Sequence, residues 1–125
     1  MNYLLLGLGI SNQSVQKYFD REKITYIAYD DKSHLVDIDL NRISTIVKSP
    51  GISPKHRLLK GENKVVTDLE LFYQFTGKKD FITVTGSNGK TTTVNLIKHL
   101  LPDLDLGGNM GKPLFDFIDS KNDII

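Results

Sequence analysis

One short segment constrains this chain more than any other: a glycine loop that joins a β-rich run to a helical pattern. Residues 81–85 read FITVT, residues 86–89 read GSNG, and Lys90 opens a helical stretch that begins with three threonines. A strand, a glycine loop and a helix in this order form a common cradle for nucleotide phosphates. The glycines let backbone N–H groups converge on one anion, and the helix adds its positive end.

The side chains of this loop fit the same chemistry. Lys90 would reach the β- and γ-phosphates of ATP, and the Thr91 hydroxyl would bind the Mg²⁺ that bridges them. Val84 stands where the general phosphate-loop pattern has its first glycine, so the loop is a shorter G-x-x-G-K-T form. A plain glycine turn is the alternative, which the three threonines disfavour because Thr is a mediocre helix former. The predicted ATP-binding residues are Gly86, Ser87, Asn88, Gly89, Lys90, Thr91 and Thr92, with Lys90 as the catalytic residue.

A second glycine turn lies near the N-terminus. Residues 3–6 are apolar and residues 7–12 read GLGISN, which is similar to a dinucleotide-binding turn. Asn12 stands where such turns carry a third glycine or alanine, and this weakens the case for a nicotinamide or flavin dinucleotide. Asp30 ends the next predicted strand, where an acidic residue would contact a ribose. A turn that binds a diphosphate and a Rossmann-type turn without a ligand both remain open.

Apolar runs of strand length alternate with helical patterns, which predicts an α/β fold with a parallel sheet and crossover helices. We expect a Rossmann-like domain over residues 1–79, followed by the start of a P-loop α/β ATPase domain over residues 80–125. The predicted strands cover residues 3–6, 24–29, 43–47, 64–66 and 81–85, with shorter runs at 104–106 and from 123. Three longer helices are predicted, the second of them opened by a capping box at Thr67. Their inner faces would carry Val15, Tyr18 and Phe19 in the first, Leu69, Phe72 and Tyr73 in the second, and Val94, Ile97, Leu100 and Leu101 in the third. Short helices are predicted at 54–60 and 113–118.

Composition removes several classes of function. The 125 residues carry 16 basic and 15 acidic side chains, so no global field attracts nucleic acid or an anionic membrane. The absence of Cys excludes disulfides, thiolate zinc sites and cysteine nucleophiles, and the three histidines lack ligand spacing. The apolar N-terminal run is too short for a membrane span and lacks the features of a signal peptide. We expect a cytoplasmic protein without nucleic-acid or membrane partners.

Five motifs in order along the chain resemble the Mur ligases: the two glycine turns, SPGI at 49–52, TDLELF at 67–72 and GGNMG at 107–111. The resemblance covers the whole chain and is nearest to the branch that adds D-glutamate to UDP-N-acetylmuramoyl-L-alanine in peptidoglycan synthesis. It implies an ATP- and Mg²⁺-dependent ligase that forms an amide bond through an acyl phosphate.

The resemblance also implies a set of substrate-binding residues. The first glycine turn would hold the UDP diphosphate, the end of the second strand would line the uracil and ribose pocket, and the SPG motif would flank the sugar. The implied UDP-substrate residues are Ile10, Ser11, Asn12, Asp30, Asp31, Lys32, Ser49, Pro50, Gly51 and Asn109.

Family members are several times longer than this chain, so the resemblance implies an N-terminal portion. The later metal ligands and the amino-acid-binding domain would lie outside these 125 residues, and we expect the isolated chain to be inactive. Two other classes stay open: a small Rossmann-type nucleotide-binding module without catalysis, and a standalone P-loop nucleotidase. The sequence also leaves open whether residues 80–125 pack on the first domain, pair between chains through unpaired strands, or are partly mobile.

Overall fold

A computed structural model describes residues 2–32, 37–77, 80–107, 112–120 and 124. Its centre is a four-stranded sheet in which every strand pairs in parallel, in the order β2-β1-β3-β4. This confirms the predicted α/β class with a Rossmann-like parallel sheet. The strands are β1 (Tyr3–Leu6), β2 (Tyr26–Tyr29), β3 (Thr45–Lys48) and β4 (Lys64–Val66).

The central strand β1 explains why the sheet must be covered on both faces. Leu4, Leu5 and Leu6 are each 0% exposed, although successive side chains of a strand point to opposite faces. Leu5 therefore packs under the helices, while Leu4 and Leu6 pack under the loops of the other face. A continuous apolar strand of this kind is typical of a parallel sheet with layers on both sides.

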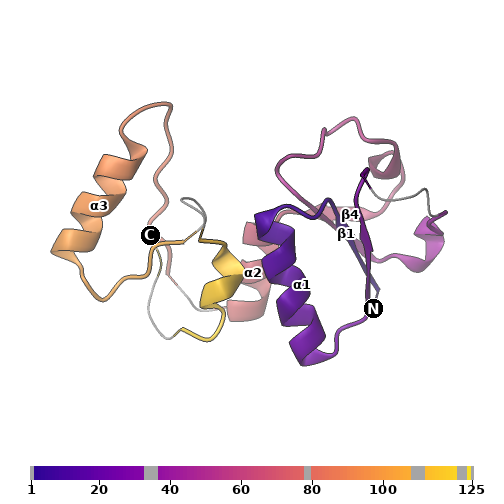
Figure 1. Ribbon diagram of the computed structural model, residues 1–125, viewed down its shortest axis with the longest axis horizontal. Coiled ribbons are helices and arrows are strands. Elements are labelled where there is room, and N and C mark those ends of the chain that lie inside the picture. Colours follow the sequence, from indigo (N-terminus) through magenta and orange to yellow (C-terminus); the bar gives the residue numbers. More distant parts are fainter. Residues whose placement is uncertain (1, 33–36, 78–79, 108–111, 121–123, 125) are drawn as a thin grey trace.

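Two helices, α1 (Ile10–Glu22) and α2 (Asp68–Thr76), cover one face of the sheet. In Figure 1 they lie between the strands and the segments that follow residue 80. Thr67 caps α2 as predicted, since its Oγ1 accepts a hydrogen bond from the Glu70 N–H at 3.3 Å. Among the described residues, no helix is long and apolar enough to cross a membrane.

The inner face of α2 differs from the prediction. Leu71 and Phe72 are fully buried, whereas Leu69 is 45% exposed and Tyr73 is 56% exposed. The prediction that Leu69 and Tyr73 are buried was therefore wrong. The reason is tertiary: α2 turns its inner face toward the core shared by the sheet, α1 and the segment around Phe115, so Leu71 takes the inward position.

The opposite face of the sheet carries loops with two short 3-10 turns. These are η1 (Leu40–Arg42) and η2 (Arg57–Leu59), and Leu58 of η2 packs on the cluster that contains Leu4 and Leu6. The predicted helix over residues 54–60 is thus reduced to a three-residue 3-10 turn.

Beyond residue 80 the described backbone has little regular strand. Phe81 and Asp105 each form an isolated parallel bridge with Ile124. The predicted strand over 81–85 was wrong in extent: the Ile82 N–H still donates to the Ile124 carbonyl at 2.9 Å, but no strand forms over residues 82–85 in the described part of the chain. The helix α3 (Lys90–Leu100) follows the glycine loop as predicted, but none of its residues is buried and Leu100 is 75% exposed.

The last described segment packs on the first part of the molecule. The 3-10 turn η3 (Leu114–Phe117) buries Leu114 and Phe115 in the same cluster as Leu5. Polar contacts tie it to α1: the Ser14 hydroxyl donates to Asp116 at 2.6 Å, and Arg21 pairs with Asp119. Hydrogen bonding by Arg21 lowers the pKa of the Asp119 carboxyl. Of the arrangements left open for residues 80–125, η3 thus adopts packing on the first part of the chain. The predicted domain boundary near residue 79 stays a prediction.

Matched leucines on two helices test this description of the core. Leu71→Ala removes a fully buried side chain, so the free energy of unfolding should fall by about 2–5 kcal/mol. Leu100→Ala removes a side chain that is 75% exposed and should change it by no more than about 0.5 kcal/mol. Urea unfolding followed by circular dichroism measures both, and equal losses would contradict the assigned core.

Candidate functional site

Two sequence motifs meet at the carboxyl edge of the sheet. Because β1 lies between β2 and β3, the ends of β1 and β3 form the switch point where open α/β sheets bind ligands. The Ser49 N–H donates to the carbonyl of Leu6 at 2.9 Å, which sets the SPGI motif beside the first glycine turn. A Cβ placed on Gly7 would lie 2.8 Å from Cγ1 of Ile52 and 2.9 Å from Cβ of Ser49. Gly7 is therefore required by close packing as well as by its φ of +87°.

The first turn of α1 opens at this switch point. Gly9 precedes the helix in an extended conformation and supplies no side-chain cap. Ile10 is 61% exposed and Ser11 is half-buried, so the start of the helix is accessible. Helix N-terminal amides that lack a cap are a favourable site for a phosphate group.

Asn12 lies beneath the turn rather than on its surface. Its side chain is fully buried, and Nδ2 approaches the carbonyl oxygens of Leu6 (3.2 Å), Gly7 (2.9 Å) and Val47 (3.0 Å). The amide thus links the ends of β1 and β3 to the helix. Its Oδ1 is buried and has no hydrogen-bond partner in the described structure. Asn12 can offer a ligand its backbone N–H, but its side chain is committed to the fold.

The other predicted UDP-site residues lie at the same edge. Asp30 and Asp31 follow β2, and Asp30 Oδ1 accepts the backbone N–H of Lys32 at 3.0 Å. Ser49 is buried, and its neighbours Pro50 and Gly51 are exposed beside the turn. Asn109 lies outside the described residues, so the structure does not address its predicted role.

An acidic side chain that the motifs did not assign to the site lies beside Ser11. Burial raises the pKa of the Asp68 carboxyl, and hydrogen bonds from nearby backbone amides and from the Ser11 hydroxyl partly oppose this rise. Asp68 begins α2, so the N-terminal ends of α1 and α2 meet at this point. The capping-box motif predicted that Asp68 lies at a helix start. No pattern in the sequence predicted that it lies next to Ser11.

The phosphate loop has the backbone that its glycines predict. Gly86 has a φ of +143° and Gly89 a φ of +79°, both in the region that favours glycine. Residues 86–89 are exposed, and α3 begins at Lys90 without a side-chain cap from Gly89. The loop therefore presents an open helix N-terminus, as a phosphate site requires.

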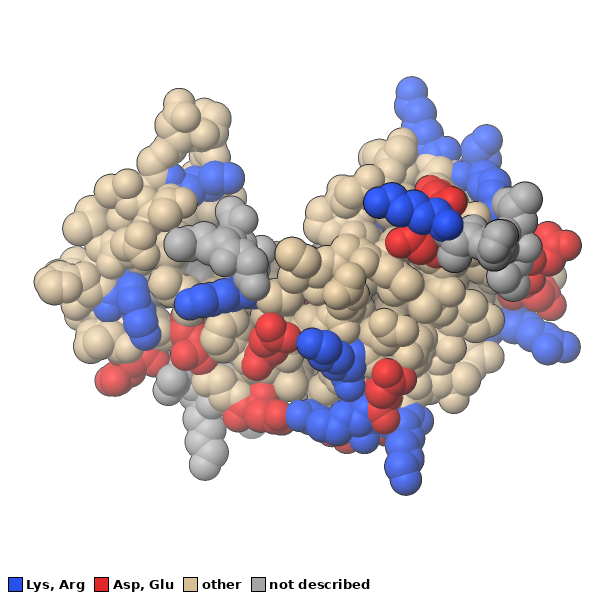
Figure 2. Space-filling model, viewed as in Figure 1, with Lys and Arg blue, Asp and Glu red and all other residues tan. Residues whose placement is uncertain are grey.

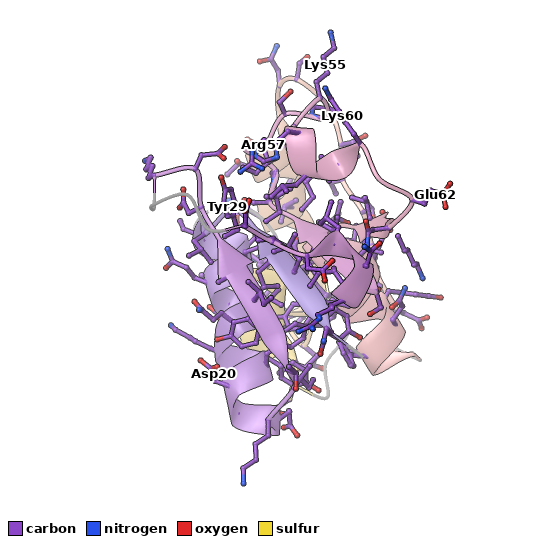
Figure 3. The ribbon with its side chains drawn as sticks, turned by 90° about the vertical axis from the view of Figure 1, so that its right-hand side faces the viewer. Asp20, Tyr29, Lys55, Arg57, Lys60 and Glu62 are labelled. Carbon is purple, nitrogen blue, oxygen red and sulfur yellow. The ribbon has the colours of Figure 1, made fainter. Side chains whose placement is uncertain are left out.

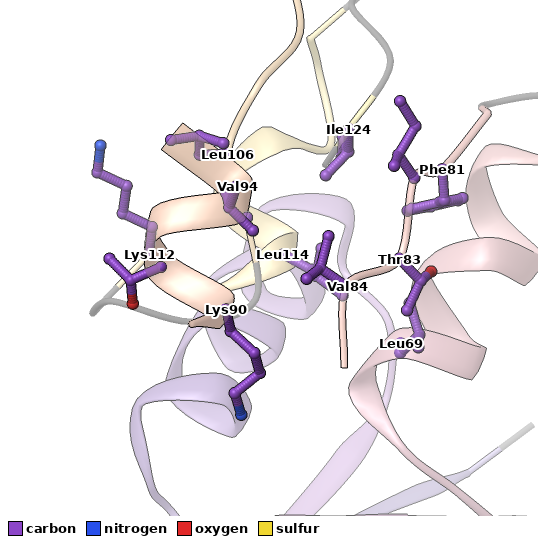
Figure 4. A pocket seen from close by; sticks show the side chains of 13 residues that line it. Leu69, Phe81, Thr83, Val84, Lys90, Val94, Leu106, Lys112, Leu114 and Ile124 are labelled. Atoms are coloured by element: carbon purple, nitrogen blue, oxygen red, sulfur yellow. The ribbon is translucent and has the colours of Figure 1, made fainter. Parts of the chain in front are cut away.

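A cavity of about 300 Å³ lies between α3 and the segment before the loop. Figure 4 shows Val84, Val94, Leu114 and Ile124 gathered around it, while the Lys90 side chain extends away from Val94 and Leu106. Thr91 also lines the cavity, whose walls are mostly apolar. Within the described residues, no three His, Cys, Asp or Glu side chains gather to hold a metal ion. Thr91, the predicted Mg²⁺ ligand, therefore has no such cluster beside it in this part of the chain.

The two glycine loops open on the same side of the molecule. In Figure 1 the phosphate loop forms the upper end of the left-hand part, and the N-terminal end of α1 also points upward. Figure 2 shows a hollow between these two parts. The two candidate phosphate sites therefore flank one depression of the surface.

Known proteins similar to this chain carry the name of one enzyme. No protein-family model matches the chain. It is 37% identical over 131 residues, covering 96% of the chain and 32% of the relative, to UDP-N-acetylmuramoylalanine–D-glutamate ligase of Francisella tularensis subsp. tularensis strain WY96-3418. It is 36% identical over 124 residues, 94% of the chain and 30% of the relative, to the enzyme of the same name from Hydrogenobaculum sp. strain Y04AAS1. The chain spans about a third of the length of the curated relatives it matches, and these matches confirm the family resemblance that the motifs indicate.

Two glycines at the switch point provide a matched test of its packing. Gly7→Ala forces a Cβ against Ile52 and Ser49 at a positive φ, so it should cost at least about 1–3 kcal/mol of stability. Gly51→Ala meets no atom within 4 Å and should leave stability nearly unchanged. Thermal unfolding compares the two variants, and a tolerated Gly7→Ala would contradict the contact between the motifs.

Two neighbouring amides of α1 test the role of Asn12. Asn12→Ala leaves three carbonyl groups without this donor in a buried place, so it should cost about 1–3 kcal/mol. Gln13→Ala removes an exposed amide that donates to the Leu8 carbonyl at 2.8 Å and should cost less than about 1 kcal/mol. Denaturant titration measures the free energy of unfolding of both variants. Equal losses would show that the buried hydrogen bonds of Asn12 stabilise the fold no more than the exposed one of Gln13.

Proposed function

We propose that this chain, which by its sequence belongs to the UDP-N-acetylmuramoylalanine–D-glutamate ligases, binds a UDP-linked sugar substrate at its first glycine turn and ATP at its phosphate loop. The observation that carries the proposal is the contact of Gly7 with Ser49 and Ile52, beneath the uncapped start of α1. That contact brings two motifs distant in sequence to one switch point, where a diphosphate has amides to bind.

The UDP end of the proposed site follows the geometry of the sheet edge. The backbone N–H groups of Ile10, Ser11 and Asn12 bind the diphosphate, while the Ser11 hydroxyl donates to Asp68. The uracil and ribose lie toward the end of β2, and the sugar lies along the SPG motif. The nucleoside residues are Asp30, Asp31 and Lys32; the sugar residues are Ser49, Pro50 and Gly51, with Asn109 nearer the reacting end.

The ATP end is built from the loop that precedes α3. Backbone N–H groups of residues 86–89 and the start of α3 surround the phosphates, and the Thr92 hydroxyl lies in the same first turn. Lys90 offsets the negative charge of the β- and γ-phosphates, which is its catalytic role in this proposal. The Thr91 hydroxyl is one ligand for Mg²⁺, and a bound Mg²⁺ supplies charge neutralisation at the γ-phosphate.

The reaction proposed for the whole ligase is the one its relatives' name describes: addition of D-glutamate to UDP-N-acetylmuramoylalanine. The terminal carboxylate of the UDP substrate attacks the γ-phosphorus of ATP. An acyl phosphate forms, and ADP is the leaving group. The amine of D-glutamate then attacks the acyl carbon and expels inorganic phosphate, which leaves an amide. The two glycine loops hold the carboxylate donor and ATP on either side of one hollow, so their part is orientation.

The 125 residues alone are proposed to bind substrate in the cytoplasm without completing this reaction. They span about a third of their relatives' length, and in their described part no group of three His, Cys, Asp or Glu side chains accompanies Thr91. The alternative is a small Rossmann-type nucleotide-binding module that catalyses no reaction.

Isothermal titration separates these functions. UDP-N-acetylmuramoyl-L-alanine and UDP should each bind with one-to-one stoichiometry, and NAD should bind at least about tenfold more weakly, a difference of about 1.4 kcal/mol. Lys90→Ala should leave UDP binding unchanged, because Lys90 belongs to the other loop. Tighter binding of NAD than of UDP would favour the nucleotide module, and ATP turnover dependent on D-glutamate would contradict the proposed inactivity.

A further inference from the structure

The loop over residues 53–60 folds back against the end of β2, and no motif in the sequence indicates this. Figure 3 shows Lys55, Arg57 and Lys60 at the same end of the sheet as Tyr29, while Asp20 lies at the opposite end. Strand β2 ends at Tyr29, so this is the edge that the carboxylates Asp30 and Asp31 share. We call residues 53–60 the basic loop.

His56 of the basic loop holds Asp31 through an oriented ring. Its Nδ1 accepts the backbone N–H of Leu58 at 3.2 Å, and its Nε2 lies 2.8 Å from Oδ1 of Asp31. Because Nδ1 acts as an acceptor, the ring proton is on Nε2, which donates to the carboxylate. The His56 side chain is 10% exposed, and its ring meets the Tyr29 ring edge-on at 6.1 Å. The imidazole is therefore fixed on three sides.

Arg57 provides a second, independent tie between the basic loop and β2. Its Nη2 donates to the Tyr29 hydroxyl at 2.9 Å, and its guanidinium carbon lies 5.6 Å from the centre of the Tyr29 ring. Tyr29 itself is 4% exposed, so the guanidinium is placed against a rigid, buried ring. The position of His56 is thus set by its neighbours and not by Asp31 alone.

Asp31 keeps one side available for a ligand. Its side chain is 56% exposed although Oδ1 accepts from His56, so the carboxylate is both held and accessible. An exposed carboxylate that is already oriented loses less conformational entropy when it accepts a hydrogen bond from a ligand. The donor groups of a nucleoside at this edge are the imide N–H of a pyrimidine base and the ribose hydroxyls.

We propose that His56 is a positioning residue for nucleoside recognition: it orients Asp31 so that the free part of its carboxylate accepts a hydrogen bond from the base or ribose of the UDP ligand. The inference rests on the proposed UDP site and adds to it a residue from outside the motifs. It predicts a loss confined to the nucleoside half of the ligand, because the diphosphate binds at the start of α1.

The test titrates UDP and inorganic diphosphate separately into the chain and its variants. His56→Phe keeps an aromatic ring but has no donor, so its UDP dissociation constant should rise about tenfold, the effect of losing roughly 1.4 kcal/mol, with diphosphate binding unchanged. His56→Gln retains a donor and should recover part of the affinity. His99→Phe makes the same change at an exposed position of α3 and should have no effect on either ligand.

A double variant separates positioning from general support of the loop. Adding His56→Phe to Asp31→Asn should weaken UDP binding no further than Asp31→Asn alone. UDP binding by His56→Phe equal to that of the unmodified chain would overturn this inference and leave the proposed function intact, as would an equal loss of UDP and diphosphate. An unmodified chain that binds diphosphate but not UDP, or neither, would overturn both.

Discussion

The buried amide of Asn12 is the interaction on which the ligand-binding edge depends. Three carbonyl groups, from Leu6, Gly7 and Val47, converge on one nitrogen at 2.9–3.2 Å. The contact joins the ends of the adjacent parallel strands β1 and β3 to the first turn of α1. Glycine at this position would permit close packing of helix and strand but would leave those carbonyl groups without this donor. The departure from the dinucleotide pattern is therefore a structural element of the site, and its cost is an unpaired Oδ1 beneath the turn.

The amount of buried apolar contact decreases with distance from this edge. The first glycine turn rests on a sheet whose central strand is fully buried, and η3 closes the helical side through Leu114 and Phe115. The phosphate loop is supported by isolated bridges at Phe81 and Asp105 and by a helix with no buried residue. Since local stability follows buried apolar contact, the sheet edge at the first glycine turn is the more rigid side of the hollow and the loop before α3 is the more adaptable side.

Periodic patterns made most of the fold predictable, and contacts between distant residues set the limits. The strand from Lys64 to Val66 and the helix start at Lys90 were found from apolar spacing, turn residues and glycine placement. The strand over 81–85 was overestimated because β-rich composition forms a strand only where a partner pairs with it. Likewise, Leu69 and Leu71 are both apolar, and packing against the core shared by the sheet, α1 and η3 decides which one faces inward.

The candidate site shows the same division. Glycine turns can be predicted from sequence because their backbone requires particular residues, so both glycine turns were found at the positions where the structure has them, and phosphate binding by them stays a prediction. His56 and Asp68 carry no such signal, since each matters only through a neighbour that the fold brings to it: Asp31 for one and Ser11 for the other. A side chain whose role is to orient another is visible only once the tertiary contact is known.

Charge links these observations. The chain has a net charge of +1, so neither anion site gains from a global field. Backbone amides at the starts of α1 and α3 supply the attraction locally, and acidic side chains stand close to the first of them. Burial raises the pKa of Asp68, so this carboxylate opposes folding above that raised pKa, and the opposition is relieved as the pH falls through it. Asp31, in contrast, is paired with His56 and is 56% exposed at the edge where the proposed nucleoside would bind. The two carboxylates of the proposed site therefore have different surroundings. Asp68 is half-buried and bonded to Ser11 near the start of α1, and Asp31 is exposed at the end of β2, where a nucleoside would offer hydrogen-bond donors.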